Sequence, residues 1–147
     1  MSEPAVRLTG VTLVVGDTSA SAAFYRLLGL AVPDDGPQPH VDIPQPDGPV
    51  AIDLDDAELA KSWSAAYRQP GGGPTAIVSL GVATRDGVDE LYARATAAGH
   101  PGVQPPFDAF WGARYAIVAD PDGNHVGLMS PMTDEHSYWP PTTSPDP

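Results

Sequence analysis

Cysteine is absent from this chain of 147 residues. Its absence excludes disulfide bonds, thiolate metal sites and a cysteine nucleophile. Long apolar runs are absent too, so the sequence predicts no membrane-spanning segment and no membrane partner. The opening residues Met1-Ser2-Glu3-Pro4 lack the basic and apolar regions of a signal peptide, and we therefore expect a cytoplasmic protein.

Positive charge is scarce, because 7 lysines and arginines stand against 19 acidic residues, for a net charge of −12. A phosphate backbone would be repelled by such a chain, so nucleic acid is not an expected partner. An acidic surface favours cationic or neutral partners, although solubility alone also explains it. Hydrophobic residues make up 41% of the chain, which is ordinary for a globular protein.

Two halves of the sequence echo each other. Tyr25 and Tyr92 lie 67 positions apart, and the same shift places the apolar run 11–15 on the run 78–82. This shared offset indicates a duplicated unit. We expect one domain over residues 1–147, with a first unit at 5–69, a second unit at 75–132 and a flexible, proline-rich tail at 133–147.

Each half predicts the same series of elements. A helix is expected from about Asp17 to Leu28 and another from about Asp86 to Ala98, each followed by a glycine that suits a helix end. Apolar, β-branched runs predict strands at 11–15, 31–32, 41–43 and 50–54, and in the second half at 77–82, 103–104, 114–119 and 125–129.

The last two strands flank the turn Asp120-Pro121-Asp122-Gly123-Asn124. Proline presets its own φ, glycine accepts a positive φ, and Asp and Asn bond to nearby backbone, so this segment predicts a β-hairpin. Together with Ala23-Phe24-Tyr25 and Leu28-Gly29-Leu30, the hairpin resembles the vicinal-oxygen-chelate superfamily of glyoxalases, bleomycin-resistance proteins and ring-cleaving dioxygenases. The resemblance covers residues 7–132. It implies an α+β fold in which tandem βαβββ units form half-barrel sheets around a concave pocket.

Within the superfamily, the aromatic-rich segment Pro105-Pro106-Phe107-Asp108-Ala109-Phe110-Trp111-Gly112 is most similar to the bleomycin-resistance-like, metal-free branch. Members of that branch are often dimers with pockets between subunits. The resemblance therefore implies a homodimer that binds a small molecule.

The resemblance also places the superfamily's metal-ligand positions at Gly10, Asp53, Ile77 and Gly127, of which Asp53 alone can bind a cation. Catalytic zinc and iron sites usually need three protein ligands. We therefore expect no metal and no other cofactor. A non-standard site built from His40, Asp53 and His125 is the alternative.

Sequence motifs for other chemistry are missing: there is no Gly-x-Ser-x-Gly elbow, Walker loop or dinucleotide fingerprint. His40 and Asp42 alternate along an expected strand and so share a face. The pair suits acid/base chemistry, but two polar residues on a wetted sheet face are the commoner explanation.

Aromatic residues supply the candidate binding site. Planar side chains stack on conjugated ligands or hold cations, although core packing and a dimer interface are equally good reasons for them. Arg114 can bind an acidic ligand group or pair with one of the many carboxylates. The predicted ligand-binding residues are Trp111, Phe110, Phe107, Asp53, Arg114, His40, Trp63 and Tyr67.

These observations favour a metal-independent binding protein that sequesters an aromatic or cationic natural product, such as an antibiotic, and so confers self-resistance. The alternatives are a glyoxalase-type lyase, isomerase or dioxygenase with a non-standard metal site, and a cofactor-free biosynthetic enzyme. The His40/Asp42 pair is the hint for the last of these.

Overall fold

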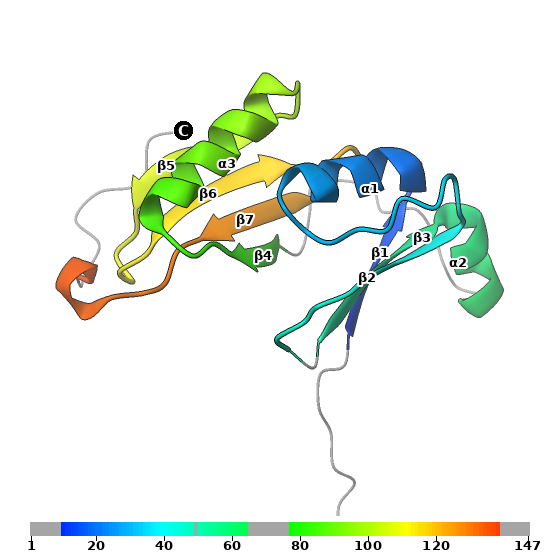
Figure 1. Ribbon diagram of the computed structural model, residues 1–147, viewed down its shortest axis with the longest axis horizontal. Helices are drawn as coiled ribbons and strands as arrows, with labels where there is room; N and C mark the ends of the chain where they lie inside the picture. Colours follow the sequence, from blue (N-terminus) through cyan, green and yellow to red (C-terminus); the bar gives the residue numbers. More distant parts are fainter. Residues whose placement is uncertain (1–9, 49, 65–76, 139–147) are drawn as a thin grey trace, which may run out of the picture. The chain divides into compact units, whose positions relative to one another are not determined.

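The structure, a computed structural model, describes residues 10–48, 50–64 and 77–138. The chain divides into two compact units, Met1–Pro70 and Gly71–Pro147, which are described separately below. The fold is α+β with two mixed sheets, neither of them closed (Figure 1). In the described part of the chain, no helix has the length and apolar character needed to cross a membrane.

The first unit holds a sheet of three strands in the order β1-β3-β2. β1 and β3 run parallel and β2 and β3 antiparallel. Helix α1 packs on β2 and β3, and its buried Phe24 and Tyr25 meet edge to face at 5.0 Å. The elements are β1 (Gly10–Val15), α1 (Thr18–Leu27), β2 (His40–Ile43), β3 (Ala51–Asp56) and α2 (Ala57–Trp63).

Helix α1 begins where the sequence predicts, because the side chain of Asp17 accepts a hydrogen bond from the Ala20 N–H at 3.1 Å. It ends before Gly29, which adopts φ 101°. The strand expected at 31–32 does not form. Instead the guanidinium of Arg26 donates to the carbonyls of Val32 and Pro33, so this segment is fastened to α1 rather than to the sheet.

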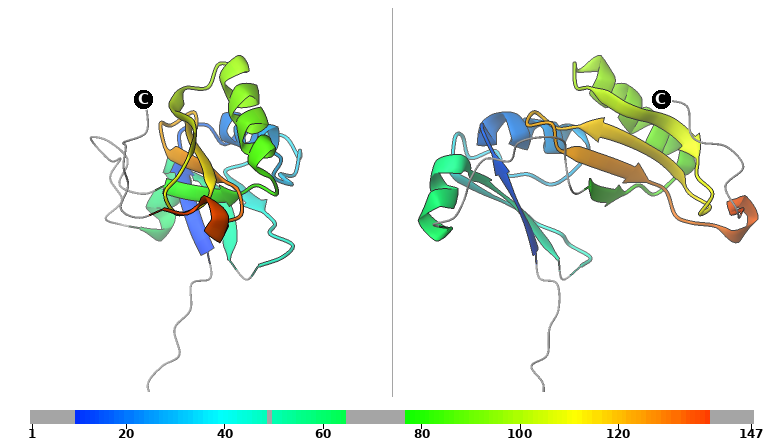
Figure 2. Two further views of the ribbon diagram at one scale, coloured as in Figure 1. Left: turned by 90° about the vertical axis from the view of Figure 1, so that its left-hand side faces the viewer. Right: turned by 180° about the vertical axis from the view of Figure 1, so that it is seen from behind.

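The second unit holds four strands in the order β4-β7-β6-β5, and α3 lies along one face of them (Figure 1 and Figure 2). Under the helix, Val118, Val126 and Leu128 are fully buried. We call the opposite side of this sheet the open face. The elements are β4 (Ile77–Gly81), α3 (Arg85–Ala97), β5 (Gly102–Asp108), β6 (Arg114–Ala119), β7 (His125–Met129) and the 3₁₀ helix η1 (Asp134–His136).

The closing hairpin has the predicted turn. Buried Asp120 accepts hydrogen bonds from the backbone N–H groups of Asp122 and Asn124, and Gly123 adopts φ 82°. Strand β5 is longer than the expected 103–104 and includes Pro105 and Pro106. Proline is tolerated there because β5 is an edge strand whose pairing with β6 is irregular.

The first residues of the tail are more regular than the sequence predicts. The Thr133 N–H donates to the Gly112 carbonyl, and the Tyr138 N–H donates to the Phe110 carbonyl. Trp111 and Ser137 form an antiparallel bridge. The first residues of the tail thus form hydrogen bonds with their own unit, which the high proline content did not predict. Residues 139–147 lie outside the described part.

Candidate functional site

Four aromatic rings meet in the second unit. The centroid of Trp111 lies 5.1 Å from that of Phe110, 5.2 Å from that of Tyr115 and 6.3 Å from that of Phe107. Phe107 and Tyr115 face each other across β5 and β6 at 6.2 Å. All four contacts are edge to face, the arrangement that the quadrupoles of aromatic rings favour. We call Phe107, Phe110, Trp111 and Tyr115 the aromatic cluster.

The ring of Tyr115 covers Gly127 on the open face. A Cβ built on Gly127 would lie 2.6 Å from the Tyr115 hydroxyl oxygen and 2.9 Å from its Cε2. Real Cβ atoms essentially never make contacts this short, so a side chain at 127 would require the Tyr115 ring to shift. Ser79, which pairs with Gly127 in the sheet, interacts with the Tyr115 hydroxyl. Burial raises the pKa of Tyr115, and Ser79 opposes this shift less strongly.

Arg114 neighbours the aromatic cluster in sequence but binds carboxylates of its own unit. Its Nε lies 2.9 Å from Asp89 on α3, and its Nη1 lies 3.2 Å from Asp108. The hydrogen bond with Asp89 is the main cause that raises the pKa of Arg114. Burial raises the pKa of Asp108, but Arg114 and Arg85 together outweigh it and leave that pKa lowered. The sequence allowed Arg114 either to bind an acidic ligand group or to pair with a carboxylate of the chain, and in the structure it forms the ion pairs.

A histidine surrounded by carboxylates lies in the first unit. His40 Nδ1 is 2.5 Å from Asp55 and 3.8 Å from Asp53, and Nε2 is 3.1 Å from Asp42. Thr12 donates to the Asp53 carboxylate at 3.1 Å. The bond to Asp55 is the main cause that raises the pKa of His40, partial burial opposes it, and Asp42 adds to it. This arrangement favours the protonated form of His40, and we call His40, Asp42, Asp53 and Asp55 the His40 cluster.

Strand pairing relates the residues around Asp53 in the first unit to those around Gly127 in the second. Asp53 pairs with Thr12 and Asp42, and Gly127 pairs with Ser79 and Ile117. Because Thr12 and Ser79 lie 67 positions apart, Asp53 and Gly127 occupy equivalent places, which confirms their predicted alignment. By the same registers, His40 corresponds to Tyr115.

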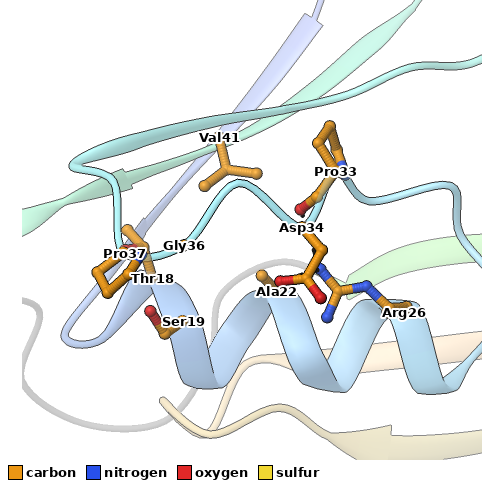
Figure 3. A pocket seen from close by; sticks show the side chains of 9 residues that line it. All are labelled: Thr18, Ser19, Ala22, Arg26, Pro33, Asp34, Gly36, Pro37 and Val41. Atoms are coloured by element: carbon orange, nitrogen blue, oxygen red, sulfur yellow. Dashed lines mark hydrogen bonds and ion pairs between the residues drawn. The ribbon is translucent and has the colours of Figure 1, made fainter.

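A cleft of about 260 Å³ lies between α1 and the segment after it (Figure 3). Arg26 and Asp34 meet at one end, and Thr18 and Ser19 lie at the other. Arg26 is engaged with backbone carbonyls, and Thr18 donates to the Gln38 carbonyl. The cleft contains none of the predicted ligand-binding residues, and its polar groups fasten the loop to the helix.

A family model, the Glyoxalase/Bleomycin resistance protein/Dioxygenase superfamily, matches residues 7–128. The chain belongs to this superfamily. An uncharacterized protein of Mycobacterium bovis is 30% identical over 128 residues, which cover 83% of this chain and 82% of the relative.

Solved structures of the superfamily agree with this fold. A glyoxalase/bleomycin resistance protein/dioxygenase from Nocardioides is 26% identical, with a TM-score of 0.68 over 90% of this chain and 88% of that one. A family enzyme from Burkholderia phytofirmans is 22% identical, with a TM-score of 0.72 over 85% of this chain and 98% of that one, and shows the fold alone.

At the positions that the resemblance assigns to the superfamily's metal ligands, the side chains do not provide a metal site. The side chains of Gly10, Ile77 and Gly127 offer no ligand atom, and Asp53 alone remains. At Gly127 the obstacle is also steric, because the Tyr115 ring occupies the space into which a ligating side chain would extend.

A different set, His40, Asp53 and Asp55, presents ligand atoms within 4.8 Å of one another. Two ligands of a tetrahedral zinc, each about 2.0–2.2 Å from the metal, lie roughly 3.4 Å apart. His40 Nδ1 and Asp55 Oδ1 are closer, at 2.5 Å. The two side chains would have to separate before both atoms could bind one metal.

The structure thus brings some predicted site residues together and places others apart. Phe107, Phe110 and Trp111 meet, as do His40 and Asp53 in the first unit. The side chain of Trp63, at the end of α2, and all of Tyr67 lie outside the described part. Sequence reasoning missed Tyr115 and Asp55. The sequence does indicate Asp55, because residues two positions apart on a strand share a face and Asp55 follows Asp53 at that spacing.

Proposed function

We propose that this chain is a metal-independent small-molecule binding protein, and that the aromatic cluster holds a planar, partly aromatic ligand such as an antibiotic. The single observation that carries the proposal is the Tyr115 ring above Gly127, which puts an aromatic surface where metalloenzymes of the superfamily have a ligand. Rings that meet edge to face are held rigidly, so little conformational entropy is lost when a ligand stacks on them.

Charge supports the same proposal. The His40 cluster holds three carboxylates around one imidazole, and the whole chain has a net charge of −12. An excess of negative charge raises the local concentration of a ligand that bears an amine. Self-resistance by sequestration follows from such binding without any chemical step. A homodimer and a cytoplasmic location remain predictions.

Fluorescence titration tests the proposal. In a Trp63→Phe/Trp139→Phe variant, Trp111 is the remaining tryptophan, and bleomycin and doxorubicin serve as probes. We expect micromolar or tighter binding of at least one probe that is unchanged by a chelator and weakened about tenfold or more by Phe107→Ala. Met132→Ala, which changes an exposed apolar residue, is the control.

Two results would overturn the proposal. One is the absence of binding tighter than weak micromolar. The other is stoichiometric zinc, iron, manganese or nickel in protein purified without chelator, combined with loss of binding when the metal is removed.

A further inference from the structure

The open face of the second unit has a polar atom at its centre. The Tyr115 hydroxyl lies above Gly127 and beside Ser79, and the rings of Phe107 and Trp111 hold the phenol by their edges. A metal ion at this place would accept an electron pair from a ligand oxygen. A phenol hydroxyl can instead donate a hydrogen bond to the same ligand oxygen.

We propose that the Tyr115 hydroxyl, which lies where the resemblance expects a metal-ligating side chain, donates a hydrogen bond to a neutral acceptor oxygen of the ligand, such as that of a ketone, aldehyde, amide or quinone. This inference rests on the proposed function and adds the chemical class of the ligand.

Protonation supports the role of donor. Burial raises the pKa of Tyr115, so the hydroxyl keeps its proton at neutral pH. The interaction with Ser79 lowers that pKa less strongly than burial raises it, so the phenol stays in its protonated, donating form.

The direction of the donor is fixed by packing. The ring lies against Gly127 and makes edge-to-face contacts with Phe107 and Trp111, which limit its movement. A neutral acceptor also suits the charges nearby. Arg114, the cation next to Tyr115 in sequence, is bound to Asp89 and Asp108, so a ligand carboxylate would compete with two protein carboxylates for it.

Two probes that differ only at the oxygen test the inference. Calorimetric titration compares 2-acetylnaphthalene, which has a carbonyl, with 2-ethylnaphthalene, which has none. We expect the wild-type chain to bind the ketone about tenfold more tightly, the effect of one net hydrogen bond. In Tyr115→Phe this preference should disappear while the affinity for 2-ethylnaphthalene stays the same. Tyr138→Phe removes a hydroxyl that donates to the Asp108 carbonyl instead, and should keep the preference.

Failure of the inference and failure of the proposed function give different results. Equal binding of the two probes by the wild-type chain, or a preference that survives Tyr115→Phe, overturns the inference alone. If neither naphthalene binds, the inference is overturned, and the titrations with bleomycin and doxorubicin decide the proposed function separately. A spectroscopic measurement covers the case in which Tyr115→Phe does not fold. The ¹³Cζ resonance of Tyr115 in the wild-type chain should shift with the ketone and not with 2-ethylnaphthalene, and equal shifts would overturn the inference.

Discussion

The Tyr115 ring packs directly over Gly127, and its phenol oxygen lies 2.6 Å from where a Cβ on Gly127 would be. The equivalent residues of the first unit are His40 and Asp53, whose Nδ1 and carboxylate oxygen lie 3.8 Å apart. The same arrangement of strands therefore carries different chemistry in the two units: an imidazole among carboxylates in the first, and a phenol above a glycine in the second. The repeat conserves backbone register, and side chains at equivalent places have different roles.

Substitution of Gly127 by alanine should destabilise the chain by roughly 1–3 kcal/mol, because the added methyl group forces the Tyr115 ring out of its packed position. Thermal and urea unfolding measure the loss. Gly81→Ala is the matched control, since Gly81 lies on a strand of the same sheet and a Cβ there would meet nothing within 4 Å.

A double-mutant cycle separates this clash from other effects of the alanine. In a Tyr115→Ala background the methyl group at 127 has room, so Gly127→Ala should cost much less there. An equal cost in both backgrounds would show that Tyr115 is not the cause.

The sequence predicts features that arise from local chemistry. Asp17 begins α1, Gly29 follows its end, and the turn at 120–124 forms because its residues supply their own hydrogen bonds and backbone angles. The repeat added long-range information, because the shift of 67 positions aligned Asp53 with Gly127 before any strand pairing was known.

Features that depend on pairing between strands were harder to predict. Tyr115 meets Phe107 only because β5 continues through Pro105 and Pro106 with an irregular register, and a proline pair normally indicates a loop. The missing strand at 31–32 depends on Arg26, whose bonds to two carbonyls have no signature in the sequence. The meeting of His40 with Asp55 requires the antiparallel register of β2 on β3.

Stability should depend on pH through His40. The pKa of His40 is raised above 6.5 in the folded chain, chiefly by Asp55, so its contribution is fully present below about pH 6.5 and is lost as the pH rises through the folded-state pKa. The free energy of unfolding of the wild-type chain relative to His40→Asn should therefore fall as the pH is raised from about 6 to above that pKa. Urea unfolding at a series of pH values measures this difference.

Proton NMR of His40 provides the direct check. Asp55→Asn should lower its pKa toward the usual value, and Asp34→Asn, at a carboxylate that is 87% exposed, should leave it unchanged. A wild-type His40 that titrates at or below the usual value would contradict the geometry.

The closing hairpin should depend on Asp120. Its carboxylate is buried and accepts from the Asp122 and Asn124 backbone N–H groups at 3.0 and 2.8 Å, and from the Asn124 side chain at 2.9 Å. Asp120→Ala leaves these donors unpaired and should cost about 2–3 kcal/mol of unfolding free energy. Asp120→Asn keeps one acceptor oxygen and should cost less, whereas Asp35→Ala, at an exposed position, should cost almost nothing. Equal losses for the two Asp120 variants would show that its second oxygen carries the effect.

Arg114 should matter for stability rather than for ligand binding. It joins α3 to β5 through Asp89 and Asp108, and a planar guanidinium can serve both carboxylates where an ammonium cannot. Arg114→Lys should lower the free energy of unfolding by about 1 kcal/mol at low salt, and the difference should shrink near 1 M salt because partly exposed ion pairs are screened. Affinity for the aromatic probes should change less than twofold. Arg94→Lys, on helix α3, is the control for a general effect of the substitution. A large loss of probe affinity in Arg114→Lys with unchanged stability would mean that the guanidinium binds the ligand after all.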